Sequence, residues 1–136
     1  MASVPWQAGG AVQLIEVTFV PGSADEVGLV IRGNGNEGTR IGIRRGDGRL
    51  LGDRTVSGNT AFHSAFASID TAPLRAVDGA YNLRIFVDHC SVEIFAQDGV
   101  VTLTELIFPD PSSTGVSLYT TGGTAKVASL RLTTLA

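Results

Sequence analysis

The fold of this chain is decided by residues 81–99, which read YNLRIFVDHCSVEIFAQDG. Apolar and polar side chains alternate on both sides of residues 88–91, and this period of two predicts a pair of half-buried β-strands. One register places the apolar residues of both strands on a single face, pairing Val87 with Val92 and Ile85 with Ile94. In that register residues 88–91 form a four-residue turn. The stretch therefore predicts an antiparallel hairpin.

A third strand follows the hairpin. Asp98 and Gly99 predict a two-residue turn, after which Val101 and Leu103 face Ala96 and Ile94. Glu93 pairs with Phe86 on the opposite face and is expected to point away from the core. Structural turn roles are expected for Asp88 and Ser91 at the first turn, where the Asp88 carboxylate should accept hydrogen bonds from the backbone amides of Cys90 and Ser91. Asp98 and Gly99 are expected to have a structural role at the second turn.

Short β-branched and aromatic runs, separated by Gly, Pro, Asn and Asp, continue along the rest of the chain. Residues 12–20 predict a strand that ends at Pro21-Gly22, because proline cannot donate a ladder hydrogen bond. Residues 27–32 and 39–44 predict a hairpin around the loop 33–38. Further turns are expected at 46–48 and 57–59, and residues 61–72 are interpreted as irregular. Residues 116–120 and 124–132 predict a closing hairpin on Gly122-Gly123, with Leu118 opposite Val127.

This spacing of strands and turns indicates an all-β protein with two antiparallel sheets, a β-sandwich of jelly-roll or concanavalin-like type. Residues 11–136 are expected to form a single module, and residues 1–10 an N-terminal extension. The predicted core is Ile15, Val17, Phe19, Ile85, Val87, Val92, Ile94, Leu103, Leu118 and Val127.

Composition excludes several functions. The chain has 136 residues and a net charge of −3, without a basic run, so nucleic acid is not expected as a partner. The single cysteine, Cys90, forms no internal disulfide. No apolar run reaches the ~20 residues of a membrane span, and residues 1–5 do not resemble a signal peptide.

Candidate chemistry is sparse. Hydrolysis of a glycosidic bond usually needs two converging carboxyl groups, and the carboxylates near strands are Glu16, Asp88, Glu93 and Glu105. Neither a converging pair, a hydrolytic triad around His63 or the adjacent His89 and Cys90, nor a metal-ligand spacing stands out. We therefore expect no catalytic residues, no metal ligands and no cofactor.

Residues 83–99 closely resemble the signature of the C-terminal module of glycoside hydrolase family 32, the family of levanase-, inulinase- and invertase-type enzymes. In that family a strand ending in Val-Asp precedes Ser-Val-Glu-Val-Phe and an Asn/Asp-Gly turn. Other matching segments are Asp53-Arg54-Thr55 with Ser57-Gly58, Ala72-Pro73-Leu74, Ile107-Phe108-Pro109 and Gly122-Gly123-Thr124-Ala125 with Ser129-Leu130. The usual Arg-Ser after Val-Asp is His89-Cys90 here. The resemblance covers about residues 12–135.

The resemblance implies a non-catalytic module, because the family's catalytic motifs lie on a separate five-bladed propeller and none occurs here. Two functions follow as alternatives: docking on and stabilising the propeller, or binding a fructan oligosaccharide. The resemblance also implies secreted or periplasmic location, gives no reason to expect a membrane partner, and allows a homo-oligomer. If the module binds sugar, which needs an aromatic platform and polar groups, the candidate contacts are Asp88, His89, Glu93, Arg44 and Tyr119.

Overall fold

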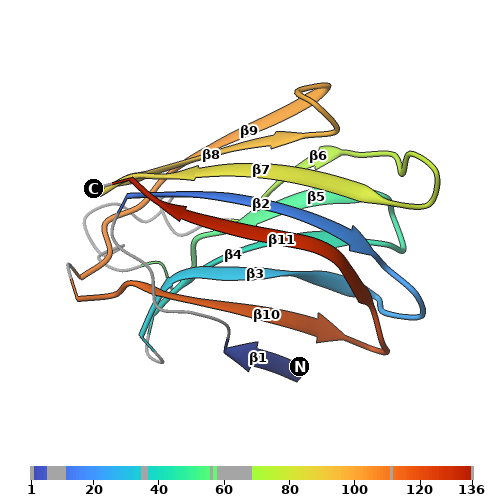
Figure 1. Ribbon diagram of the computed structural model, residues 1–136, viewed down its shortest axis with the longest axis horizontal. Helices are drawn as coiled ribbons and strands as arrows, with labels where there is room; N and C mark the ends of the chain where they lie inside the picture. The colour runs from blue at the N-terminus through green and yellow to red at the C-terminus, as the bar shows by residue number, and fades with distance from the viewer. Residues whose placement is uncertain are drawn as a thin grey trace.

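The computed structural model describes residues 2–5, 12–34, 37–55, 57, 69–110 and 112–135. The regular secondary structure in these ranges consists of β-strands. They form two antiparallel sheets that pack as a sandwich (Figure 1). Among these residues no helix is long and apolar enough to cross a membrane. The predicted all-β, two-sheet architecture is confirmed.

Within the described residues, six strands form one sheet and five form the other. The six-stranded sheet has the order β1 (Ala2–Pro5), β10 (Gly115–Thr121), β3 (Glu26–Gly33), β4 (Thr39–Arg44), β5 (Arg49–Asp53), β6 (Ile69–Pro73). The five-stranded sheet has the order β11 (Lys126–Thr134), β2 (Gln13–Val20), β7 (Tyr81–Val87), β8 (Ser91–Ala96), β9 (Val101–Leu106).

The central meander has the register that its apolar pattern predicts. Val87 pairs with Val92 and Ile85 with Ile94 across β7 and β8, and the same alignment continues into β9, where Ala96 pairs with Val101. The prediction of a two-residue turn at Asp98-Gly99 is wrong. Residues 97–100 all lie between the strands, and Gln97, Asp98 and Gly99 have φ angles of 52°, 58° and 87°.

The core lies between the two sheets. Most of the predicted core is buried, namely Ile15, Val17, Phe19, Ile85, Val87, Val92 and Ile94, while Leu103 and Leu118 pack against it partly buried. The six-stranded sheet contributes Leu29, Ile31, Ile41, Ile43 and Leu50. Val127 is 36% exposed, because it lies on the edge strand β11 at the margin of the core.

The predicted closing hairpin is wrong. Leu118 pairs with Leu29 in β3, whereas Val127 pairs with Phe19 in β2, so β10 and β11 belong to different sheets. The turn at Gly122 (φ 68°) and Gly123 (φ 155°) carries the chain from one sheet to the other. Glycines permit such a turn, but they do not determine which strands pair on either side of it.

Two further segments differ from expectation. Residues 69–72, predicted to be irregular, form most of β6 and pair with β5, although this edge strand lacks the alternating burial that would reveal it in a sequence. Part of the expected N-terminal extension forms β1 and pairs with β10. The hairpin of residues 27–32 and 39–44 is confirmed as β3 and β4. Residues 35–36, 58–59 and 61–68 lie outside the described residues.

Candidate functional site

The predicted ligand contacts lie in three separate regions. Tyr119 and Arg44 lie on the outer face of the six-stranded sheet, on strands whose alternate residues enter the core. Glu93 lies on the outer face of the five-stranded sheet, paired with Phe86. Asp88 and His89 lie at the β7–β8 turn, beyond the end of the sheet. The fold therefore does not gather these residues into one site.

The outer face of the six-stranded sheet has two glycines side by side, Gly28 on β3 and Gly42 on β4. Gly28 pairs with both Tyr119 and Gly42, so the row across three strands contains one aromatic ring and two positions without side chains. The Tyr119 ring lies across this row, and a Cβ atom at Gly42 would collide with its hydroxyl. Although Tyr119 is on an outer face, it is only 2% exposed.

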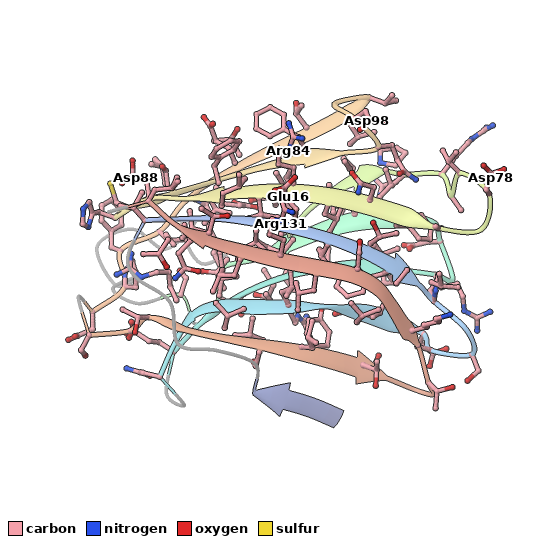
Figure 2. The ribbon with its side chains drawn as sticks, in the orientation of Figure 1. Glu16, Asp78, Arg84, Asp88, Asp98 and Arg131 are labelled. Atoms are coloured by element: carbon pink, nitrogen blue, oxygen red, sulfur yellow. The ribbon has the colours of Figure 1, made fainter. Side chains whose placement is uncertain are left out.

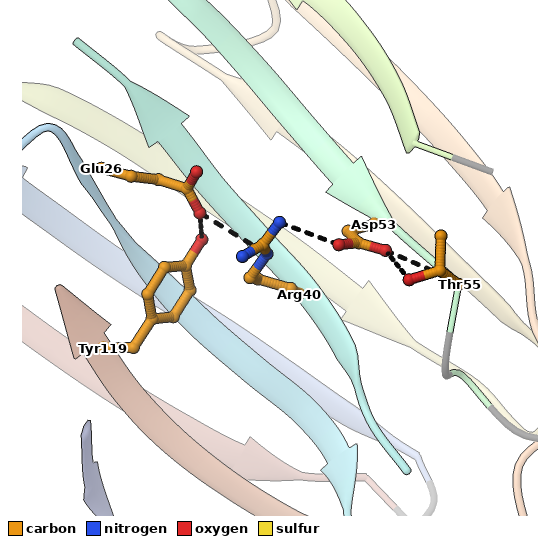
Figure 3. Close-up of polar contacts among 5 residues, drawn as sticks. All are labelled: Glu26, Arg40, Asp53, Thr55 and Tyr119. Atoms are coloured by element: carbon orange, nitrogen blue, oxygen red, sulfur yellow. Dashed lines mark hydrogen bonds and ion pairs between the residues drawn. The ribbon is translucent and has the colours of Figure 1, made fainter. Parts of the chain in front are cut away.

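A polar network surrounds the Tyr119 ring (Figure 3). Its hydroxyl donates a hydrogen bond to the Glu26 carboxylate, which also lies 3.5 Å from the Arg40 guanidinium. Arg40 donates to Asp53 at 2.8 Å and lies 5.8 Å from the centre of the ring, within cation–π range. Burial, with the Glu26 hydrogen bond, raises the pKa of Tyr119, so its hydroxyl is a fixed donor. Arg40 is thus held from two sides.

The other arginines of this face also have internal partners. Arg44 makes a bidentate contact with Asp47 at 2.8–3.1 Å, and Arg49 donates to the Thr71 hydroxyl at 2.8 Å. The Arg44 contact lowers the pKa of the Asp47 carboxyl. We call Arg40, Arg44, Arg49, Leu51 and Tyr119 the arginine–tyrosine face. It presents guanidinium groups whose positions are fixed before any partner arrives.

The β7–β8 turn is stabilised differently from the prediction. The Asp88 carboxylate was expected to accept hydrogen bonds from the amides of Cys90 and Ser91, but it accepts one from the His89 amide, at 2.7 Å. The Asp88 amide donates to the Ser91 carbonyl at 2.9 Å and closes the turn. His89 and Cys90 are exposed.

Arg32 fastens this turn to the loop that precedes β10. Its guanidinium donates to the carbonyl oxygens of Ser113 (2.6 Å), His89 (3.1 Å), Asp88 (3.3 Å) and Asp110 (3.4 Å). The side chain can turn toward these oxygens because the Arg32 backbone has φ 48°, where the ladder between β3 and β10 is irregular. Sequence reasoning missed this residue, since no local pattern indicates a bulge there.

The outer face of the five-stranded sheet carries a row of charged side chains. Arg131, Glu16 and Arg84 are cross-strand neighbours on β11, β2 and β7 (Figure 2), and Arg84 lies 3.7 Å from Glu16. Phe95 continues the row opposite Arg84, and its ring meets that of Phe86 edge to face, with the centres 6.0 Å apart.

A shallow hollow of about 260 Å³ lies beside these rings. It is lined by Asn82, Arg84, Phe86, Phe95, Asp98 and Gly99. The Gln97 side chain fixes its end: the amide nitrogen donates to the carbonyls of Arg75 and Ala80, and the amide oxygen accepts from the Asn82 backbone. Asp98, in contrast, makes no hydrogen bond or ion pair with any other residue that the structure describes. Asp98 is exposed at the β8–β9 turn, where Figure 2 labels it, and it lines the hollow.

The remaining carboxylate of interest, Glu105, lies inside the sandwich. It is 1% exposed and lies 3.5 Å from Arg54, and a Cβ atom at Gly52 would collide with it. Burial, together with Asp70, raises the pKa of Glu105 to about 8. The close packing leaves no room for a substrate. The described residues also contain no group of three acidic, His or Cys side chains that could hold a metal ion.

The comparison with family models and the sequence relatives identify the family of this chain. The family model of the glycosyl hydrolases family 32 C terminal matches residues 2–134. The levanase of Bacillus subtilis (strain 168) is 44% identical over 128 residues, and the match covers 93% of this chain but 19% of the levanase. The extracellular exo-inulinase of Aspergillus awamori is 37% identical over 106 residues, 76% of this chain and 20% of that protein. The crystal structure of an exo-inulinase from the same fungus superposes with a TM-score of 0.85 at 29% identity, covering 97% of this chain and 28% of that one.

Proposed function

This chain belongs to the C-terminal family of the glycosyl hydrolases family 32, and on that premise we propose that it is a non-catalytic accessory module of a fructan- or sucrose-cleaving enzyme, where it docks on the catalytic propeller and stabilises it. The proposal rests on the share of each sequence that the match covers. The match covers nearly the whole chain, yet the chain spans about a fifth of the levanase and exo-inulinase relatives. The rest of such an enzyme then supplies the catalytic domain.

We assign the docking surface to the arginine–tyrosine face. Arginine is enriched in protein interfaces and carries much of their binding energy, and Tyr119 contributes here as the buried support of Arg40. On this face Arg40 and Arg44 keep 30% and 42% of their side-chain surface exposed while their positions are already fixed. Fixed side chains lose little conformational entropy on association.

The test is to mix this chain with a separately expressed catalytic domain of its parent enzyme. We expect a one-to-one complex and a higher melting temperature of the catalytic domain, because a ligand that binds only the folded state stabilises it. Arg44→Glu should weaken the complex, whereas the matched Arg131→Glu, on the outer face of the other sheet, should leave it intact. No complex, or a homodimer of this chain through the same face, would contradict the proposal.

The same relatives suggest where the parent enzyme works. Exo-inulinases that match this chain are extracellular proteins of Aspergillus, so we propose an exported parent, to be checked by locating it in culture medium or periplasm. A second candidate function, oligosaccharide binding, is supported by the hollow on the outer face of the five-stranded sheet, away from the proposed docking surface.

A further inference from the structure

We propose that the hollow lined by Asn82, Arg84, Phe86, Phe95, Asp98 and Gly99 binds a fructosyl unit of a neutral oligosaccharide. The fructosyl identity of the ligand rests on the proposed function, because the levanase and exo-inulinase relatives point to fructans. The preference for a neutral, hydroxyl-rich ligand rests on the geometry of the hollow itself. The site lies on the outer face of the five-stranded sheet, so it stays open when the arginine–tyrosine face is docked.

The two phenylalanines supply an apolar platform. Their rings are almost perpendicular, at 89°, so one ring presents its edge to the other and the pair does not close on itself as a stack. Phe86 is 39% exposed, so part of its ring is available to a ligand. Such a surface suits the C–H groups of a sugar ring, which are its only apolar part.

Polar groups of both kinds surround the platform. Arg84 provides a planar set of donors: its guanidinium lies 3.7 Å from Glu16, beyond hydrogen-bond distance, and 58% of its side-chain surface is exposed. Asp98, at the other end, provides carboxylate oxygens that accept hydrogen bonds from hydroxyl groups. Glu16 and Arg84 offset each other in charge, and Asp98 disfavours an anion. Glu93, which pairs with Phe86 on the same face, adds a second carboxylate that is uncompensated among the described residues, so the surroundings of the hollow disfavour an anion while donors and acceptors together suit vicinal hydroxyls.

The hollow is also preorganised and small. The Gln97 side chain bonds to Arg75, Ala80 and Asn82, so the turn that carries Asp98 is fixed at its base. Two non-glycine residues of this turn, Gln97 and Asp98, have positive φ, a conformation that side chains rarely adopt. The volume of about 260 Å³ is below the ~300–1,000 Å³ of sites for drug-sized ligands. It therefore suits one or two sugar units.

The test is a titration of the isotope-labelled 136-residue chain with inulin-type and levan-type fructo-oligosaccharides, followed by two-dimensional NMR. We expect saturable binding, with shifts concentrated at residues 82–86 and 95–99. Phe95→Leu, which keeps the apolar volume but removes the ring, should weaken binding at least tenfold, and Asp98→Asn should weaken it severalfold. Arg131→Ala, on the same face but outside the hollow, is the matched control and should bind like the native chain.

Three results would overturn the inference. These are no saturable binding of either oligosaccharide, unchanged affinity in both the Phe95→Leu and Asp98→Asn variants, and equal binding of glucose oligosaccharides of the same length. Folding of each variant is checked by its melting curve, and Asp98→Asn serves if Phe95→Leu is unstable. Failure here is distinguishable from failure of docking, because Phe95→Leu should still form the complex with the catalytic domain.

Discussion

Replacement of Glu105 by Gln should change how the stability of this protein depends on pH. Glu105 is buried between the sheets, and its pKa is raised from 4.5 to about 8. A carboxyl whose pKa is higher in the folded state binds a proton more tightly there than in the unfolded chain. The stability that this proton contributes is fully present below about pH 4.5 and is lost as the pH rises to 8.

The magnitude follows from linkage. Between pH 5 and pH 7 the folded protein retains close to one proton that the unfolded chain releases, and each pH unit then removes about 1.4 kcal/mol from the free energy of unfolding. Over that range the contribution of Glu105 falls by about 2 kcal/mol. Gln cannot ionise but has nearly the same shape, so the variant lacks this loss. Relative to the native protein, Glu105→Gln should therefore become more stable by about 2 kcal/mol as the pH rises.

Urea denaturation at pH 5, 6, 7 and 8 measures this difference, provided that the slope with denaturant is the same for both proteins. Glu93→Gln is the matched control, because it makes the same chemical change at an exposed position on the neighbouring strand β8. Parallel stability profiles for the native and Glu105→Gln proteins would refute the reasoning. A fall in the stability of Glu105→Gln relative to the native protein with rising pH would refute it too.

Further variants test the contacts described above by thermal or urea denaturation. Tyr119→Phe leaves the buried Glu26 carboxylate without its hydroxyl donor and should cost about 1–3 kcal/mol. Gly42→Ala should cost about 1–3 kcal/mol, because its methyl group collides with the Tyr119 hydroxyl, and the double variant with Tyr119→Phe should lose less than the sum. Arg32→Ala removes charged donors from several carbonyl groups and should cost about 2 kcal/mol, with increased hydrogen exchange in the β7–β8 turn. Asp88→Ala should cost about 1 kcal/mol through its lost bond to the His89 amide, whereas His89→Ala should stay within about 0.5 kcal/mol; equal losses in these two would contradict the assigned contact.

The meander could be predicted from the sequence because its evidence is local. Ile85 and Ile94 are separated by one short turn, and a slip of one residue would expose the apolar set of a whole strand. The end of the chain has equally clear strands and turn glycines. Their pairing still could not be inferred, because β10 and β11 find their partners in β3 and β2, far away in sequence.

The candidate sites were predicted only in part, for the same reason. Arg44 and Tyr119 were recognised by residue type, but the Tyr119–Glu26 bond joins residues 93 positions apart and depends on glycines at Gly28 and Gly42. The hollow beside Phe95 depends on a four-residue turn that the sequence pattern shortened to two. Side-chain chemistry was thus visible in the sequence, whereas the sheet face and the turn that position it were not.

Docking through the arginine–tyrosine face is tested most directly by an NMR map of the isotope-labelled chain with its parent's unlabelled catalytic domain. We expect the signals of β4, β5 and β10 around Arg40, Arg44 and Tyr119 to shift or broaden on complex formation, while those around Phe95 and Arg84 do not. Changes confined to β7 and β8, or a spectrum identical to that of the free chain, would contradict docking through the arginine–tyrosine face.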